Sequence, residues 1–134
     1  MNDKIRAAFL VLVLLQALHS VEELLLHFYE VFPPMALLYR DAPSWARPAF
    51  IVSNVVLVTA GLVCWRLWVV PGGRWARGVV WAWAGGEAFN VIAHCVWAVA
   101  ARGYNPGLVT GLGFVPVVAY LIYLLRRAPT YAAA

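Results

Sequence analysis

The sequence predicts an all-α protein, a four-helix transmembrane bundle, from its composition and from four long apolar runs. Hydrophobic residues make up 64% of the 134 residues, and charged residues make up only 12%. Soluble domains contain about 25% charged residues, so this chain has too little polar surface to remain in water. The composition excludes a soluble globular domain, a disordered chain and a disulfide-rich secreted scaffold. The length allows about four spans of ~20 residues each.

The first two apolar runs are bounded by prolines. Because lipid offers the backbone no hydrogen-bonding partner, each run is expected to be helical. The first helix is predicted over residues 5–31, since its run begins after two basic residues and stops at Pro33, where a helix cannot easily continue. The second is predicted over residues 49–70, between Pro48 and Pro71.

The last two runs have equally clear limits. The third helix is predicted over residues 75–101, and the fourth over residues 107–125, where Arg126 and Arg127 close it. Short connections favour antiparallel neighbouring helices. No linker is long enough to separate two domains, so we expect a single membrane domain over residues 1–134.

The ten Lys and Arg residues fall at predicted helix ends, so they indicate membrane topology and not a nucleic-acid partner. The side that holds both termini has seven of them, namely Lys4, Arg6, Arg66, Arg74, Arg77, Arg126 and Arg127. The other side has Arg40, Arg47 and Arg102. The positive-inside rule then predicts an integral protein of a bacterial-type plasma membrane with both termini in the cytoplasm.

Polar residues within the first predicted helix repeat with helical spacing. At about 100° per residue, one narrow arc of the helix contains Gln16, His19, Glu23, His27 and Glu30. Glu22 lies beside this arc, next to His19. The helix therefore presents a polar stripe inside an apolar span.

A second polar stripe lies on the third predicted helix, where Glu87, Asn90 and His94 follow spacings of three and four residues. Counting along each helix places this stripe and His19 between the membrane midplane and the predicted outer face. An ionised side chain at the bilayer centre costs at least ~2.5–3.5 kcal/mol. These groups must therefore face one another, water or a metal ion, which predicts one site in the outer half of the bundle.

The residue types in this site suit a metal ion, because zinc and iron accept mixed imidazole and carboxylate ligands. The predicted ligands are His19, Glu23, Glu87 and His94. The predicted supporting residues are Asn90, His27 and Trp97, the last of which lies one turn from His94. The alternative interpretation is a buried hydrogen-bonded network that only locks the helices together.

Three sequence elements resemble a known family. Residues 19–23 spell H-x-x-E-E, His94 follows on the third helix, and residues 104–107 spell Y-x-P-G. In this order, and in a four-span chain of this size, they resemble the HXXEE family of small membrane proteins, whose function is undetermined. The resemblance runs from the first helix to the start of the fourth. It implies the fold class and metal or acid–base chemistry, but no established reaction.

The leading functional hypothesis is a small membrane enzyme acting on an apolar, lipid-like or isoprenoid substrate, for example an isomerase or a cyclase. Its predicted reactive centre consists of His19, Glu22, Glu23 and His94, with Tyr104 as a lid or proton donor. The alternatives are a non-catalytic metal-binding or transport-related protein, and a structural or accessory protein with a buried polar cluster. The sequence leaves open the substrate, the metal, a homo-oligomeric state and whether the second helix lines the site.

Overall fold

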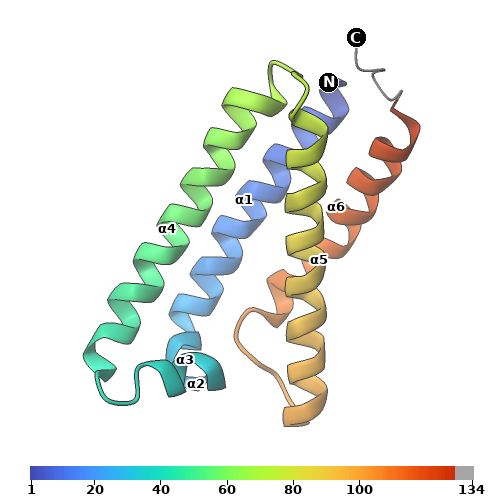
Figure 1. Cartoon of the computed structure of the whole chain (residues 1–134). Coiled ribbons are helices and arrows are strands. Elements are labelled where there is room, and N and C mark those ends of the chain that lie inside the picture. The colour runs from blue at the N-terminus through green and yellow to red at the C-terminus, as the bar shows by residue number, and fades with distance from the viewer. Residues whose placement is uncertain (129–134) are drawn as a thin grey trace.

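The computed structural model describes residues 1–128, and all regular structure in this part of the chain is helical (Figure 1). The four long helices are α1 (Asp3–Leu25), α4 (Ala46–Cys64), α5 (Ala76–Ala101) and α6 (Leu108–Arg127). Three short elements join α1 to α4, namely α2 (Phe28–Val31), α3 (Pro33–Leu38) and the 3-10 turn η1 (Pro43–Trp45). A π-helical segment, η2 (Trp65–Val69), continues α4. The all-α prediction is confirmed.

Three helical segments are long and apolar enough to cross a membrane, namely Asp3–Leu25, Pro43–Val69 and Leu108–Arg127. The chain is therefore a helical membrane protein. With 26 residues, α5 is also long enough to span, but Glu87, Asn90 and His94 make it less apolar. A fourth span formed by α5 stays a prediction.

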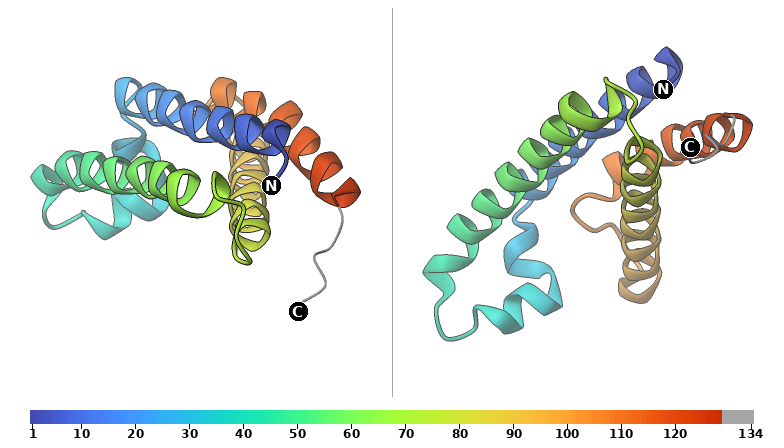
Figure 2. Two further views of the ribbon diagram at one scale, coloured as in Figure 1. Left: turned by 90° about the horizontal axis from the view of Figure 1, so that it is seen from above. Right: turned by 45° about the horizontal axis from the view of Figure 1, so that its top comes forward.

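The long helices do not pack evenly around one axis. α6 packs against both α1 and α5, and α4 packs against α1. Figure 2 shows α1 and α4 running side by side, whereas α5 diverges from them. η2 contacts α5 at one end of the bundle, but α4 and α5 separate toward the other end (Figure 1).

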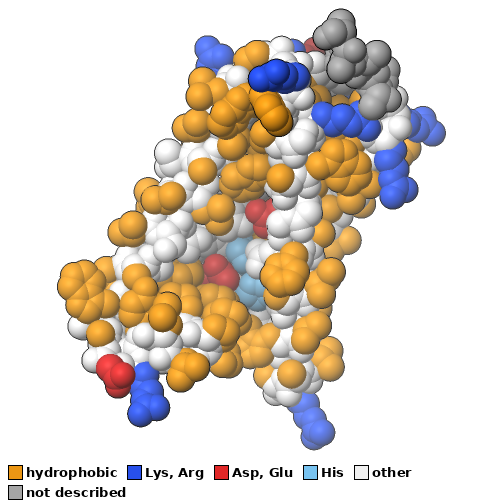
Figure 3. Space-filling model, viewed as in Figure 1, with side chains coloured by type: hydrophobic (Ala, Val, Ile, Leu, Met, Phe, Trp, Pro, Cys, Tyr) orange, Lys and Arg blue, Asp and Glu red, His pale blue; other side chains and the backbone are white. Residues whose placement is uncertain are grey.

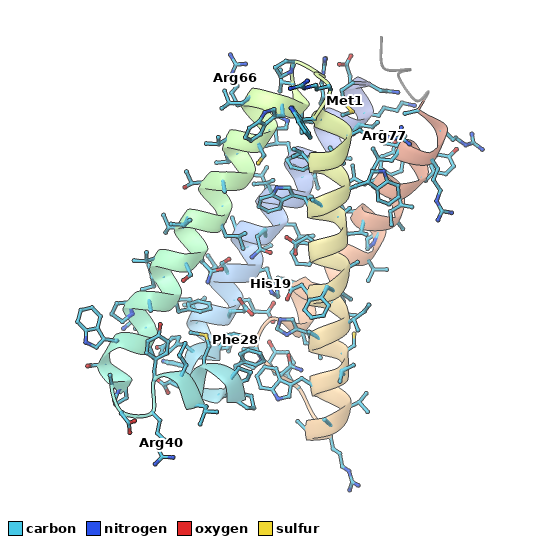
Figure 4. All side chains as sticks on the ribbon, viewed as in Figure 1. Met1, His19, Phe28, Arg40, Arg66 and Arg77 are labelled. Carbon is cyan, nitrogen blue, oxygen red and sulfur yellow. The ribbon has the colours of Figure 1, made fainter. Side chains whose placement is uncertain are left out.

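The basic residues mark the two ends of the bundle. Met1, Arg66 and Arg77 lie at one end, and Arg40 lies at the opposite end (Figure 4). This arrangement agrees with the assignment of the loops to two sides of a membrane. Which side faces the cytoplasm stays a prediction.

The single helix predicted over residues 5–31 is divided by the structure. α1 ends at Leu25, and His27 adopts a left-handed backbone conformation with φ of 56° before α2 begins. A left-handed residue cannot continue a right-handed helix, so the chain changes direction there. His27 and Glu30, which were expected to continue the polar stripe, are therefore exposed and lie off that line.

The second helix also begins earlier than predicted. α4 starts at Ala46, so Pro48 lies inside its first turn and does not precede the helix. A proline is tolerated there because the first turn leaves its backbone N–H groups without intrahelical partners.

Two apolar clusters lie on either side of the polar residues of α1. The larger cluster joins α1 to α6, and its fully buried members include Phe9, Leu12, Phe114, Leu121 and Leu125. The smaller cluster, at the other end of α1, contains Phe28, Tyr29, Ala46 and Phe50. The segment of α1 between them buries Gln16, His19, Ser20 and Glu23. This order places the polar residues inside the bundle with apolar packing on both sides.

Candidate functional site

His19, Glu23 and His94 converge inside the bundle. Glu23 Oε1 lies 3.5 Å from His19 Nε2 and 3.4 Å from His94 Nε2. The two imidazole rings are nearly perpendicular, with centroids 5.0 Å apart. One ligand atom from each residue lies within 4.8 Å of the other two, and all three residues are buried. We refer to these three residues as the His/Glu cluster.

The helices bring the cluster together in a simple way. His19 and Glu23 are separated by one turn of α1, so they share a face of that helix. His94 reaches the same point from α5. The loop between α5 and α6 then closes over the cluster, because α6 packs against both helices.

The side chain of Asn105 fixes the tautomer of His94. Asn105 is buried, and its Nδ2 donates to the backbone carbonyl oxygen of His94 at 2.9 Å. Its Oδ1 therefore faces His94 Nδ1 at 2.7 Å and can only accept a hydrogen bond. His94 accordingly carries a hydrogen on Nδ1, and its Nε2 is the ring nitrogen that faces Glu23.

An equivalent arrangement orients His19. Thr110 Oγ1 donates to the carboxylate of Glu22, so the same oxygen accepts from His19 Nδ1 at 2.8 Å. On the other side of the ring, Asn90 Nδ2 donates to His19 Nε2 at 3.1 Å. These contacts assign the donor role to Nδ1 of His19 and the acceptor role to its Nε2.

These donors fit a zinc or iron(II) ion. Metal-binding histidines usually donate their second ring N–H to a carboxylate, a carbonyl group or water, and both rings here donate through Nδ1. Ligand atoms ~2.0–2.1 Å from a tetrahedral ion lie about 3.4 Å apart, which matches the two distances from Glu23 Oε1 to the ring nitrogens. The cluster could therefore hold a metal ion, as the sequence predicted for three of its four ligands.

Gly107 is the point where the Y-x-P-G loop contacts the cluster. Its φ is 88°, a left-handed conformation that glycine adopts without strain. A Cβ atom at this position would lie 2.6 Å from His94 Cε1 and 2.7 Å from His19 Cε1. It would also lie 3.0 Å from Glu23 Cγ. Only a residue without a side chain can occupy this place, so the glycine of the motif belongs to the site.

Glu22 lies outside the His/Glu cluster and has a different set of partners. Its carboxylate accepts hydrogen bonds from the hydroxyl group of Tyr104 and from the backbone N–H of Thr110, the latter at 2.9 Å. Partial burial and the hydrogen bond to Glu22 raise the pKa of Tyr104 to about 12, so the phenol remains a donor at neutral pH. Thr110 thus connects Glu22 to His19, and the catalytic role of Glu22 stays a prediction.

Glu87, predicted as a fourth ligand, is not part of the ligand group found among residues 1–128. It is buried on α5. When the amide of Gln16 is oriented with its nitrogen toward Glu87, that nitrogen lies 3.1 Å from both carboxylate oxygens. Glu87 is therefore a hydrogen-bonded neighbour of the cluster.

The remaining predicted residues separate into two groups. Asn90 contacts His19, as described, and Trp97 packs in the smaller apolar cluster with its ring 6.4 Å from that of His94. His27 is exposed and takes no part in the cluster. The sequence did not single out Asn105, although its place inside the Y-x-P-G motif was the available signal.

A cleft opens beside the cluster, with a volume of about 590 Å³. His19 and Glu23 line it from α1, and Glu87 and Asn90 line it from α5. α4 supplies Phe50, Ser53, Asn54 and Leu57, so the second predicted helix does line the site. Figure 3 shows acidic and histidine side chains at the bottom of the hollow between α4 and α5.

The fold and the site define a helical membrane protein with a buried cluster of histidine and glutamate. The family model described as "Protein of unknown function with HXXEE motif" matches residues 10–121. The chain therefore belongs to the HXXEE family, as the sequence elements indicated. No curated protein and no solved structure gave a significant match.

Proposed function

We propose that this protein is a metal-dependent membrane enzyme that acts on an apolar, lipid-like substrate. The observation that carries the proposal is the geometry of the cluster beside the cleft. His19 and His94 both direct Nε2 toward Glu23, and each ring is held at Nδ1 by a protein partner. Two ring nitrogens directed at one carboxylate, with both rings held from behind, form the arrangement that a metal site of this ligand type requires.

The residues around the cluster have distinct roles in this proposal. His19, Glu23 and His94 would hold zinc or iron(II), which acts as a Lewis acid when bound. Asn105 fixes the ring of His94, and Glu22 fixes the ring of His19 through Thr110. Three protein ligands would leave room for a further ligand on the ion, as in catalytic zinc sites.

The walls of the cleft support an apolar substrate. Aromatic and aliphatic side chains from α2, α4 and α5 line it, including Phe28, Phe50, Leu57 and Trp83. Glu87 and Asn90 provide polar atoms in the same cleft and can position a polar group of the substrate. A carboxyl group in this place can also move a proton, which suits isomerisation or cyclisation of a lipid or isoprenoid.

The loop between α5 and α6 supports a position of the site in the outer half of the membrane. Asn105 and Gly107, in the loop between α5 and α6, contact the cluster directly. With both termini in the cytoplasm, this loop lies on the outer side, so the site lies in the outer half of the bundle. The support is the excess of basic residues at the opposite end.

Metal content tests the proposal most directly. The untagged full-length protein, purified in a mild detergent, is expected to contain one zinc or iron ion per chain by mass spectrometry. His19→Ala, Glu23→Gln and His94→Ala should each lose this ion, because each removes a ligand. His27→Ala is the matched control, since His27 is an exposed histidine outside the cluster and the variant should keep the ion. Wild-type protein that binds no transition metal after supplementation would contradict the proposal.

Activity is tested with membrane lipids. A total lipid extract is incubated with metal-loaded wild-type protein or with the Glu23→Gln variant, and the products are compared by mass spectrometry. We expect a lipid species that changes only with the wild type. A bound metal without any lipid change would favour the non-catalytic metal-binding or transport-related alternative. Loss of folding in all three ligand variants, with no metal in the wild type, would favour a structural or accessory role.

A further inference from the structure

The lining of the cleft restricts the headgroup of its occupant. Its ionisable groups come from α1 and α5, and they are His19, Glu23 and Glu87. Among residues 1–128, which include every Lys and Arg of the chain, no basic side chain lines the cleft. Figure 3 shows the basic side chains at the ends of the molecule and away from the hollow.

Apart from His19, the ionisable groups that line the cleft are acidic. Glu23 and Glu87 each contribute a carboxyl group to its lining. If either is protonated, it still contributes no positive charge. A carboxylate or phosphate headgroup would therefore enter a site without Arg or Lys to compensate it, which is strongly unfavourable in a low-dielectric interior.

The hydrogen-bonding groups of the cleft suit a small neutral headgroup. Asn90 and Glu87 on α5 face the same cleft as Ser53 and Asn54 on α4. Such groups can donate to and accept from one hydroxyl or carbonyl group, which a neutral lipid supplies.

The cleft also has a side through which a lipid can enter. α4 and α5 diverge there, and α4 belongs to one of the apolar spans (Figure 2). Gly86 lines the cleft on α5, and a Cβ atom at this position would meet no heavy atom within 4 Å. The missing side chain leaves room beside the opening, so a membrane-dissolved molecule can reach the cluster without crossing water.

We infer that the cleft takes a neutral lipid with a single hydrogen-bonding headgroup, an alcohol or a carbonyl compound, and excludes fatty acids and phosphate esters. This inference rests on the proposed function, since it names the substrate class of the same site. It follows from three features of the cleft, namely apolar walls, polar groups that include the carboxyl groups of Glu23 and Glu87, and no Lys or Arg side chain among the described residues that line it.

The test uses three photoreactive hexadecyl probes that differ only in their headgroup, namely an alcohol, a carboxylic acid and a phosphate. Each probe is irradiated with zinc-loaded full-length protein in phosphatidylcholine nanodiscs, and labelled peptides are mapped. The alcohol should label the α4 and α5 segments that line the cleft about tenfold more efficiently than either anion, equivalent to ~1.4 kcal/mol. Labelling of these segments by the acid or the phosphate at the level of the alcohol would overturn the inference, as would no cleft labelling by the alcohol.

Neighbouring glycines supply a matched control. Gly86→Leu fills the cleft, whereas Gly85→Leu places the same side chain in open space at a position that does not line it. Gly86→Leu should lose labelling by the alcohol, and Gly85→Leu should keep it. Both variants should retain zinc. Ala82→Leu, which also lines the cleft, should repeat the effect of Gly86→Leu.

The results separate the inference from the proposed function. If Gly86→Leu and Ala82→Leu retain zinc and full labelling, the lipid binds elsewhere and the inference fails. Metal binding can still be intact in that case. If the wild type binds no metal, the proposed function fails, and the relative labelling by the three probes still reports the headgroup preference of the cleft.

Discussion

The two halves of the α1–α6 contact are built from different chemistry. In the half near the termini, α1 buries Phe9 and Leu12 against Phe114 and Leu121 of α6. In the other half, the same pair of helices joins His19 to Thr110 and Glu22 to Thr110 through hydrogen bonds. Lipid chains are as apolar as these side chains, so the first half is held mainly by close packing. The second half requires a partner for each polar group.

The apolar and polar halves of the α1–α6 contact also differ in the hollows beside them. The apolar half has a fully buried core that includes Phe9 and Leu121, and its own hollow, of about 470 Å³, is lined mainly by apolar side chains of α1 and α6. The polar half carries the cleft, yet within residues 1–128 the one buried side-chain nitrogen or oxygen without a partner is Arg6 Nε, at the opposite end. The hydrogen-bonded network around the cluster therefore holds its side chains in place beside open space.

The largest expected effect is the loss of metal binding in Gly107→Ala, a substitution that changes only the polar half. The new methyl group would overlap both histidine rings, and alanine at a left-handed position adds about 1–2 kcal/mol of strain. We expect loss of metal binding in a protein that still forms its helices, measured by metal content and circular dichroism. Gly103→Ala is the control, because the nearest atom to its Cβ lies at 3.8 Å and its metal content should not change. Equal metal content in both variants would contradict the role assigned to Gly107.

Leu121→Ala tests the apolar half with an effect of intermediate size. Removing a fully buried leucine leaves a cavity, and we expect a loss of about 2 kcal/mol of stability. This lies at the lower end of the range because lipid removes part of the hydrophobic contribution. Thermal unfolding in detergent should shift, whereas the metal content of the folded protein should equal that of the wild type. A Leu121→Ala variant that loses its metal would show that the two halves are coupled.

The smallest expected effect comes from Thr110, which links the halves through α6. Thr110→Val removes the hydroxyl group that orients His19 and connects it to Glu22. Loss of such an outer partner lowers metal affinity by about 10- to 100-fold, and we expect the lower end of this range because Asn90 still holds the ring of His19. Competition with a zinc chelator should show this change. Thr110→Ser retains the hydroxyl group and should restore affinity. If Val and Ser behave alike, the hydroxyl group does not act through His19.

Several features of the site could be predicted because they depend on spacing along one helix. His19 and Glu23 are one turn apart, so their shared face follows from helical geometry alone. His94 was expected at the same depth because α5 runs parallel to α1 in the predicted topology. The roles of Glu22 and Glu87 could not be predicted in this way. Neighbours on other elements, Thr110 and Gln16, decide what these two carboxyl groups contact.

The contacts of the loop between α5 and α6 also could not be predicted from the sequence. Y-x-P-G indicated a turn, and Tyr104 was expected near the site. The hydrogen bonds of Asn105 to His94 and the contact of Gly107 with both histidines depend on how α6 is placed against α1 and α5. Likewise, a single left-handed residue at His27 ended the predicted polar stripe, and no hydrophobic period could signal it.

The sequence by itself determined that this is a helical membrane protein of the HXXEE family with histidine and glutamate inside its spans. Composition and helical period are local properties, and lipid leaves the backbone little choice but a helix. The tertiary structure alone decided which three side chains meet, which nitrogen of each histidine faces Glu23, and where the cleft opens. Those outcomes depend on contacts between α1, α5, α6 and the loop before α6, and such contacts form only when separate helices pack together.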